Sequence, residues 1–150
     1  MKKFILTAVL ISMAYAFSAD IIWRKYKEIV SDVTISSTDN LIIEAGTTVR
    51  FAPGASLNVY GQITSNGTET EPVILAPLYR DSLRWDGIKI NSMSGINNFT
   101  YTHFNFLNPP VGSGDGGLTI YKSNATITNC RFKNCSGESG GAVKITSGNV

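Results

Sequence analysis

The chain has 150 residues and a mass of 16.2 kDa, which is the size of one domain. Apolar residues make up 43% of it, aromatic residues 10%, and charged residues only 16%. So few charges exclude a coiled coil or a charged helical bundle, and so many apolar residues exclude disorder. The formal charge is +2, and it falls to zero when Lys2 and Lys3 are set aside as part of a targeting segment. We therefore expect no nucleic-acid partner.

The N-terminus has the layout of a secretory signal peptide. Lys2 and Lys3 form a short positive region, an uncharged and mostly apolar run covers residues 4–15, and small residues follow up to Ala19. Twelve residues rise only ~18 Å as a helix, which is short of the ~30 Å hydrocarbon core of a membrane. We therefore predict a signal peptide over residues 1–19 and no transmembrane span in the mature chain. The expected location is secreted or cell-surface, at a bacterial outer membrane or outside the cell.

From residue 32 onward the sequence predicts short β-strands separated by turns. The expected strands cover residues 33–35, 41–43, 48–51, 57–60, 72–75, 87–90 and 99–101. Gly46, Gly54 and Gly61 stand between them, as turn residues do. No stretch after Val30 keeps a helical period over two turns, so we predict an all-β fold. Residues 20–31 are expected to form an N-terminal cap segment, whose apolar spacing also fits a first strand.

Two repeated elements indicate a solenoid. The pair Gly116-Gly117 recurs as Gly140-Gly141, and Gly87 opens a strand of the same form one coil earlier. A second alignment matches residues 102–106 to residues 128–132. The glycine pairs give a period near 24, which is the size of one coil of a parallel β-helix, whose coils stack ~4.8 Å apart. We expect the strands at Gly87, Gly117 and Gly141 to share one sheet, with Asn and Gly at the corners.

These residues carry a family resemblance. Several runs resemble the opening coils of secreted bacterial right-handed β-helix proteins of the pectin-lyase-like superfamily, namely 32–35, 41–51, 55–61, 66–68 and 71–75. The run 85–88 (Trp-Asp-Gly-Ile) is similar to an element that follows in that family, and 129–143 resembles later coils, including those of polymorphic outer-membrane adhesins. The resemblance implies a right-handed parallel β-helix of about four to six coils over residues 32–150. It leaves function open, because lyases, adhesins and surface scaffolds share this solenoid.

The final coil is expected to be incomplete. After residues 147–150 nothing corresponds to Ile127, Cys130 and Phe132 of the coil before. A solenoid whose last coil is uncovered exposes apolar side chains and unpaired strand edges. We therefore interpret the sequence as the N-terminal portion of a longer β-helix, with the alternative that the last coil packs against another molecule.

Cys130 and Cys135 are the only cysteines, and their spacing matches no zinc or redox motif. In an exported protein one interpretation is a local disulfide. The other is that Cys130 points into the stack beside Phe132 while Cys135 lies at the next corner, both as packed thiols. His103, one coil away, is expected to lie at the surface.

The acidic residues do not gather into a catalytic site. Lyase sites need two or three acids on one face together with a base, and polygalacturonase-type sites need close Asp residues. In the predicted register no two acids occupy the same position of adjacent coils. We therefore predict no catalytic, cofactor-binding or metal-binding residue. The acids concerned are Asp32, Asp39, Glu44, Glu69, Glu71, Asp81, Asp86, Asp115 and Glu138.

Aromatic side chains are the remaining candidates for ligand contact. Five are expected to be exposed, where they would stack on sugar rings: Tyr60, Tyr79, Trp85, Tyr101 and Tyr121. Two function hypotheses follow. The first is a non-catalytic secreted or cell-surface module, a rigid scaffold that binds polysaccharide or a host or cell-surface protein. The second is the N-terminal part of a carbohydrate-active lyase or hydrolase whose active site lies beyond residue 150.

Overall fold

A computed structural model describes residues 18–79, 84–93 and 95–150. This part of the chain contains fifteen strands and no helix. The strands are β1 (Asp20–Trp23), β2 (Tyr26–Ile29), β3 (Val33–Ile35), β4 (Asn40–Ile43), β5 (Thr48–Phe51), β6 (Ser56–Val59), β7 (Gln62–Asn66), β8 (Val73–Pro77), β9 (Gly87–Ile90), β10 (Ile96–Thr100), β11 (Thr102–Asn105), β12 (Leu118–Tyr121), β13 (Asn124–Thr128), β14 (Arg131–Lys133) and β15 (Val143–Thr146).

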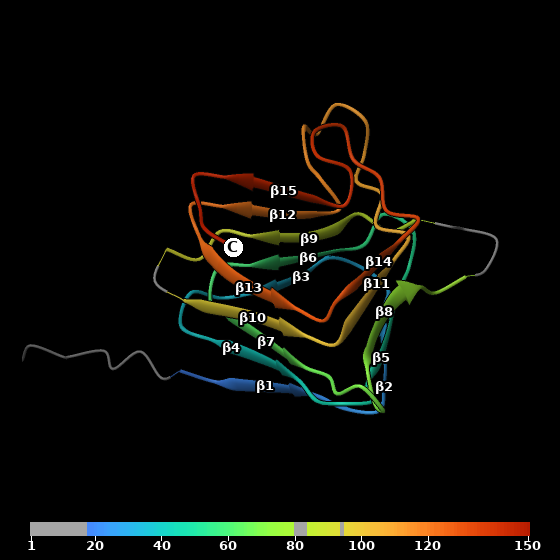
Figure 1. Ribbon diagram of the computed structural model, residues 1–150, viewed down its shortest axis with the longest axis vertical. Coiled ribbons are helices and arrows are strands. Elements are labelled where there is room, and N and C mark those ends of the chain that lie inside the picture. Colours follow the sequence, from blue (N-terminus) through green and yellow to red (C-terminus); the bar gives the residue numbers. More distant parts are fainter. Residues whose placement is uncertain (1–17, 80–83, 94) are drawn as a thin grey trace, which may run out of the picture.

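The strands form three parallel sheets, and successive coils of the chain stack along one axis (Figure 1). Sheet A has the order β1-β4-β7-β10-β13, sheet B β14-β11-β8-β5-β2, and sheet C β15-β12-β9-β6-β3. Each coil gives one strand to each sheet in turn, so neighbours within a sheet are three strands apart in sequence. The predicted all-β parallel solenoid is confirmed, with about four turns.

The core is the interior of this stack. Strand side chains alternate between the inside and the outside, so inward residues of successive coils lie above one another. In sheet C the inward residues Leu57, Ile88 and Leu118 are all fully buried and occupy matching positions. Inside the stack, the Trp85 ring lies on the Phe51 ring with centroids 3.9 Å apart and planes within 9°. Such a stacked pair stabilises the fold by about 0.5–1.5 kcal/mol beyond the free energy gained by burying the two rings.

Sheet C confirms the prediction that the strands at Gly87, Gly117 and Gly141 are stacked. Leu118 lies between Ile88 on one side and Val143 on the other. Between β12 and β15 the predicted register is wrong by one position, because the alignment of the glycine pairs would place Leu118 beside Ala142. Between β9 and β12 the predicted alignment of Gly87 with Gly117 is confirmed, since Ile88 pairs with Leu118. Gly140 and Gly141 both have positive φ, 93° and 35°, so they form the turn before β15.

The second predicted alignment is also displaced. Phe104 of β11 pairs with Phe132 of β14, where the alignment of the sequence placed Phe104 beside Cys130. The two coils nevertheless carry the same residue type at this position, and the rings of Phe104 and Phe132 stack with their centroids 4.5 Å apart. Turns of unequal length lie between the strands, and a repeat measured across a turn therefore does not give the strand register.

The corners carry residues in the left-handed backbone region. Asn129 and Asn134 both have a φ of 54°, which confirms the prediction of Asn at corners. In the coil before, Tyr101 (φ 43°) and Phe106 (φ 58°) occupy the corresponding corners. A large side chain is uncommon in this region, because its Cβ crowds the backbone.

The first coil begins at Asp20. Residues 20–31, expected to be a cap segment, form β1 and β2, which pair with β4 and β5 as the outermost strands of sheets A and B. The predicted signal peptide lies outside the described residues except for Ser18 and Ala19. In the described ranges, no helix has the length and apolar character needed to cross a membrane.

Candidate functional site

The outer face of sheet C presents two rows of side chains in register. The first row runs through the middle of the strands, and the second lies at their carboxyl ends. Cα pairing aligns Asn58, Lys89, Thr119 and Lys144 in the first row. Continuing the same register aligns Tyr60, Asn91, Tyr121 and Thr146 in the second. These side chains line a groove of about 290 Å³ that crosses four coils.

One wall of the groove is the loop of residues 106–117, which projects from the corner between sheets B and C. Asp115 of this loop lines the groove and pairs with Lys89, with 2.8 Å between Oδ2 and Nζ. The Lys144 ammonium donates a hydrogen bond to the carbonyl of Gly114. Both lysines therefore lie across the groove and hold its wall.

A second loop, 134–142, projects beside the first, as Figure 1 shows at the corner next to β12 and β15. Glu138 joins the two loops, because its Oε2 accepts hydrogen bonds from the backbone N–H groups of Gly112 and Gly114, both at 2.9 Å. The Glu138 N–H donates to the Asp115 carbonyl at 3.0 Å. The wall is thus fixed to the following coil.

Two tyrosines supply the aromatic surface of the groove. Tyr60 is 49% exposed and Tyr121 40% exposed. The Lys122 ammonium lies 5.1 Å from the centroid of the Tyr121 ring, and it covers one ring face. Tyr60 and Tyr121 occupy the same row two coils apart, which corresponds to ~9.6 Å along the axis at the usual strand spacing.

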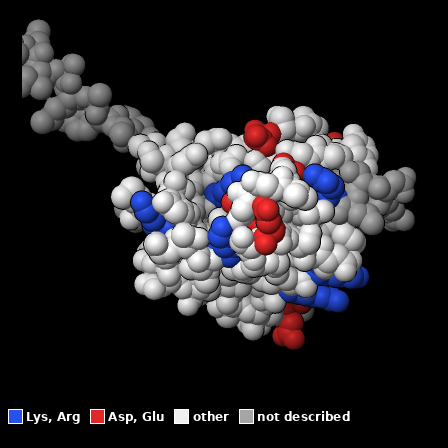
Figure 2. All heavy atoms as spheres, turned by 90° about the horizontal axis from the view of Figure 1, so that it is seen from above, with Lys and Arg blue, Asp and Glu red and all other residues white. Residues whose placement is uncertain are grey.

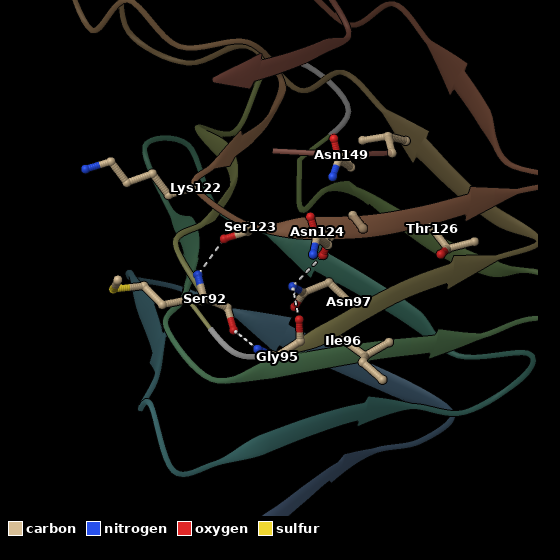
Figure 3. A pocket seen from close by; sticks show the side chains of 12 residues that line it. Ser92, Gly95, Ile96, Asn97, Lys122, Ser123, Asn124, Thr126 and Asn149 are labelled. Atoms are coloured by element: carbon tan, nitrogen blue, oxygen red, sulfur yellow. Dashed lines mark hydrogen bonds between the residues drawn. The ribbon is translucent and has the colours of Figure 1, made fainter. Parts of the chain in front are cut away.

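A larger cavity, of about 440 Å³, lies at the corner between sheets C and A (Figure 3). Three of its polar side chains, those of Ser92, Asn97 and Ser123, bond to the backbone around it. Ser123 Oγ accepts from the Ser92 N–H at 2.7 Å and donates to the Tyr121 carbonyl at 2.8 Å. Asn97 Nδ2 donates to the Asn124 carbonyl at 3.0 Å. The groove on sheet C differs from this cavity in presenting two exposed tyrosines, which makes it the better candidate for contact with a sugar ring.

Several acids are engaged separately, whereas Asp32 and Asp86 lie close enough to repel each other. Asp32 accepts from the N–H and the hydroxyl of Ser56 at 2.9 and 2.8 Å, and Glu44 pairs with Arg24 at 3.0 Å. Desolvation raises the pKa of Asp86, whose Oδ1 is buried without a partner. Asp81 lies outside the described residues.

Within the described ranges, no group of three or more His, Cys, Asp and Glu is placed to hold a metal ion. His103 points outward from β11, between Ile74 and Arg131 of the neighbouring strands. Figure 2 shows the molecule from above, where acidic and basic side chains are few and mixed in sign.

The expected exposure of Trp85 is wrong, since its side chain is fully buried. Its Nε1 donates to the Asn105 carbonyl at 2.9 Å, and its ring completes the interior aromatic stack. Of the other candidate aromatics, Tyr60 and Tyr121 reach the groove, Tyr79 lines a different pocket, and Tyr101 lies at a corner. Sequence reasoning missed Lys89 and Lys144, although each stands between two inward residues of its predicted strand.

The two cysteines are free thiols packed beneath successive corners. The Cys130 Sγ–H donates to the Phe99 carbonyl at 3.3 Å, and the Cys135 Sγ–H donates to the Phe104 carbonyl at 3.4 Å. Burial raises the pKa of both thiols. Of the two interpretations that the sequence left open, the structure has the packed thiols.

Comparison with family models, with curated proteins and with solved structures finds no match to this chain. The resemblance to β-helix proteins is therefore supported at the level of the parallel β-solenoid fold.

Proposed function

We propose that the chain is a non-catalytic, secreted or cell-surface β-solenoid module that binds an extended polysaccharide along the groove of sheet C. The observation that carries this proposal is the pair Tyr60 and Tyr121, half-exposed in one row of a polar groove. Export rests on the predicted signal peptide at residues 1–19. The pectin-lyase-like resemblance is consistent with such a role, and the solenoid itself is compatible with several others.

The geometry suits a chain of sugars parallel to the solenoid axis. A tyrosine ring offers an apolar face to the C–H face of a sugar, and its hydroxyl stays in water. Two coils separate the rings, so a linear glycan would contact Tyr60 and Tyr121 with sugars that are not adjacent. Between them Asn91 supplies an amide donor and acceptor for sugar hydroxyls, while the Thr119 hydroxyl is bonded to Gly116 and Lys89 is paired with Asp115.

The rigidity of sheet C beneath the groove favours binding of a regular polymer. Asn58, Lys89 and Thr119 are attached to strands paired on both sides, so their spacing is set by the backbone ladder. A preformed row loses little conformational entropy when a repeating ligand binds to it.

An enzyme remains the second candidate, and the observation in its favour is Asp115 beside Lys89 in the same groove. An acid and an amine in contact are the elements of proton transfer, although their pairing here occupies both groups. Release of unsaturated or reducing oligosaccharides by the purified chain, abolished by Asp115→Asn, would establish this alternative and overturn the non-catalytic proposal.

Affinity gel electrophoresis tests the binding proposal. Gels containing soluble xylan, mixed-linkage β-glucan, galactan or pectin are run with the wild type and with Tyr60→Ala and Tyr121→Ala. We expect at least one polysaccharide to retard the wild type, and each substitution to weaken that retention about fivefold to tenfold, as lost ring stacking of about 1 kcal/mol or more implies.

Tyr101→Ala is the matched control, because Tyr101 is a partly exposed tyrosine at a corner outside the groove. Its retention should equal that of the wild type. The proposal fails if none of the polysaccharides retards the wild type, or if the two groove variants are retained as strongly as the control.

A further inference from the structure

A second pocket lies on the outer face of sheet B, away from the groove. It encloses about 220 Å³. Ile74 and Ala76 of β8 form part of its lining, Phe106 and Tyr79 provide aromatic surface, and Arg50 is its charged residue. Within the lining, Tyr79 is 57% exposed, while Ala76 is buried even though it points outward from the sheet. The pocket is therefore apolar inside and open to solvent at one side.

Phe106 has an unfavourable backbone for its residue type. Its φ of 58° is in the left-handed region, where the equivalent corner of the next coil has Asn134 at 54°. Asparagine tolerates this region and a large aromatic residue does not, so a phenylalanine here costs conformational energy. Its ring is only partly buried and lines the pocket, so burial in the core does not explain the choice. Phe106 therefore gives the pocket an aromatic surface that its counterpart in the next coil, Asn134, lacks.

Basic side chains surround the pocket. One outward row of sheet B contains Glu28, Arg50, Ala76, Asn105 and Lys133, and the adjacent row ends in His103 and Arg131. The acid of these rows, Glu28, accepts from the Tyr26 hydroxyl at 2.7 Å and lies on the far side of Arg50. Arg50 Nη1 donates to the Pro77 carbonyl at 3.0 Å, which holds the guanidinium at the pocket. Among the described residues, these two rows therefore carry more basic than acidic side chains.

We propose that this pocket is a docking site for an aromatic side chain from an acidic segment of a partner protein. The volume fits one ring, Phe106 and Tyr79 stack against it, and the cations Arg50, Arg131 and Lys133 attract the flanking carboxylates. An aromatic anchor in a pocket with a charged rim is the arrangement that dominates the energy of many protein interfaces. This proposal is independent of glycan binding, because none of its residues lines the groove on sheet C.

Fluorescence anisotropy tests it with a labelled peptide of composition Asp-Glu-Phe-Asp-Glu, blocked at both ends. We expect saturable binding to the wild type and a Kd about tenfold higher for Phe106→Asn, which removes the ring and relieves the backbone. Tyr79→Ala, at an exposed position, should weaken binding in the same direction and tests the pocket with little risk to folding. Tyr101→Asn is the matched control: it makes the same backbone change at a corner outside the pocket and should leave the Kd unchanged.

Two further peptides test whether the aromatic residue and the acidic residues are both needed for binding. A peptide with Ala in place of Phe should bind at least tenfold more weakly, and a peptide with Lys in place of the acids should not bind. The proposal is overturned if the wild type does not bind the acidic peptide, if the Ala peptide binds equally well, or if Phe106→Asn and Tyr79→Ala both retain the wild-type Kd. Binding of phosphatidylserine vesicles in preference to the peptide would assign the face to a lipid surface and also overturn it.

Discussion

Small polar residues close the corners of this solenoid in a repeated way. A residue with positive φ comes first, and the next side chain donates to the carbonyl two residues before it. Thr102 bonds to the Thr100 carbonyl at 3.2 Å, Ser123 to Tyr121 at 2.8 Å, and Cys130 to Thr128 at 3.4 Å. Cys135 repeats the pattern after Asn134. The cysteines therefore take the place of hydroxyl residues, which gives them a structural role.

The thiols should react slowly in the folded protein. Burial raises the pKa of Cys130 and Cys135, so the nucleophilic thiolate is scarce at neutral pH. We expect labelling by a disulfide reagent at pH 8 to be much slower in the native protein than in urea. Rapid labelling of both thiols without denaturant would contradict this packing.

The same shift predicts the direction of a pH effect on stability. A folded-state pKa above the unfolded one means that the unfolded chain loses its thiol protons first as the pH rises. The stability contributed by the protonated thiols is therefore complete below about pH 8.5 and declines above it. Urea midpoints measured between pH 7 and pH 10 should fall, and the fall should be smaller in the Cys130→Ser, Cys135→Ser double variant.

Residue-level sequence reasoning worked where side-chain chemistry and backbone conformation agree. Asn was predicted at corners because few residue types tolerate positive φ, and Asn129 and Asn134 occupy two of them. Trp85 was misplaced because a polar segment surrounds it in sequence. Its burial depends on Phe51, which is distant in sequence and which only the three-dimensional stack brings into contact. The two tyrosines of the groove were recognised, but their common row required the true register.

At the scale of single strands, the backbone ladder demands glycine where coils approach closely. Gly87 opens β9 with a φ of 88°, and a Cβ at this position would lie 2.1 Å from the Gly117 carbonyl oxygen of the next coil. Gly54 has a similar φ of 78°, but nothing lies within 4 Å of the corresponding Cβ. The two positions share their backbone conformation and differ in the space around it.

Alanine substitution separates these two effects. Gly54→Ala should cost about 1 kcal/mol of unfolding free energy, since only the backbone conformation is penalised. Gly87→Ala should cost roughly 2–4 kcal/mol, because the β9–β12 pairing must also open. Urea denaturation of both variants measures the difference. Equal losses would show that the close contact with Gly117 has no energetic weight.

The strands were easier to predict than their pairing. Apolar alternation within each short segment identified β5, β6 and β9 directly, because each has an inward pair that the interior must bury. The spacing between coils was harder. The alignment of Gly87 with Gly117 gave the true pairing of Ile88 with Leu118, whereas the alignment of the two glycine pairs missed the pairing of Leu118 with Val143 by one residue. Turn lengths differ from coil to coil, and no local pattern encodes which residues of the long connections pair.

For the whole molecule, protection from solvent differs along the axis. β9 pairs on both sides and its inward Ile88 and Ile90 are at most 1% exposed. β15 pairs with β12 alone, and its Ile145 is 47% exposed. Local opening is easiest where burial is least and backbone hydrogen bonds face water.

Hydrogen exchange measured by NMR should follow this gradient. The amides of β9 and β6 are expected to exchange at rates set by the most extensive unfolding of the chain. Those of β15 should exchange far faster, with the alternate amides that lack a partner strand showing almost no protection. Equal protection of β15 and β9 would mean that the outermost strand of sheet C is covered in solution.

The loop at 106–117 and its neighbour at 134–142 have an evolutionary consequence. The ladder fixes the strands on either side, so insertions and deletions between residues 109 and 115 alter no strand pairing. Doubling the length of a flexible loop costs only ~0.6 kcal/mol. Yet the same loops hold Asp115 and Glu138, which shape the wall of the groove. If the groove binds a glycan as proposed, ligand preference can change at this one corner, through loop length and loop sequence, while the pairing of the strands stays the same.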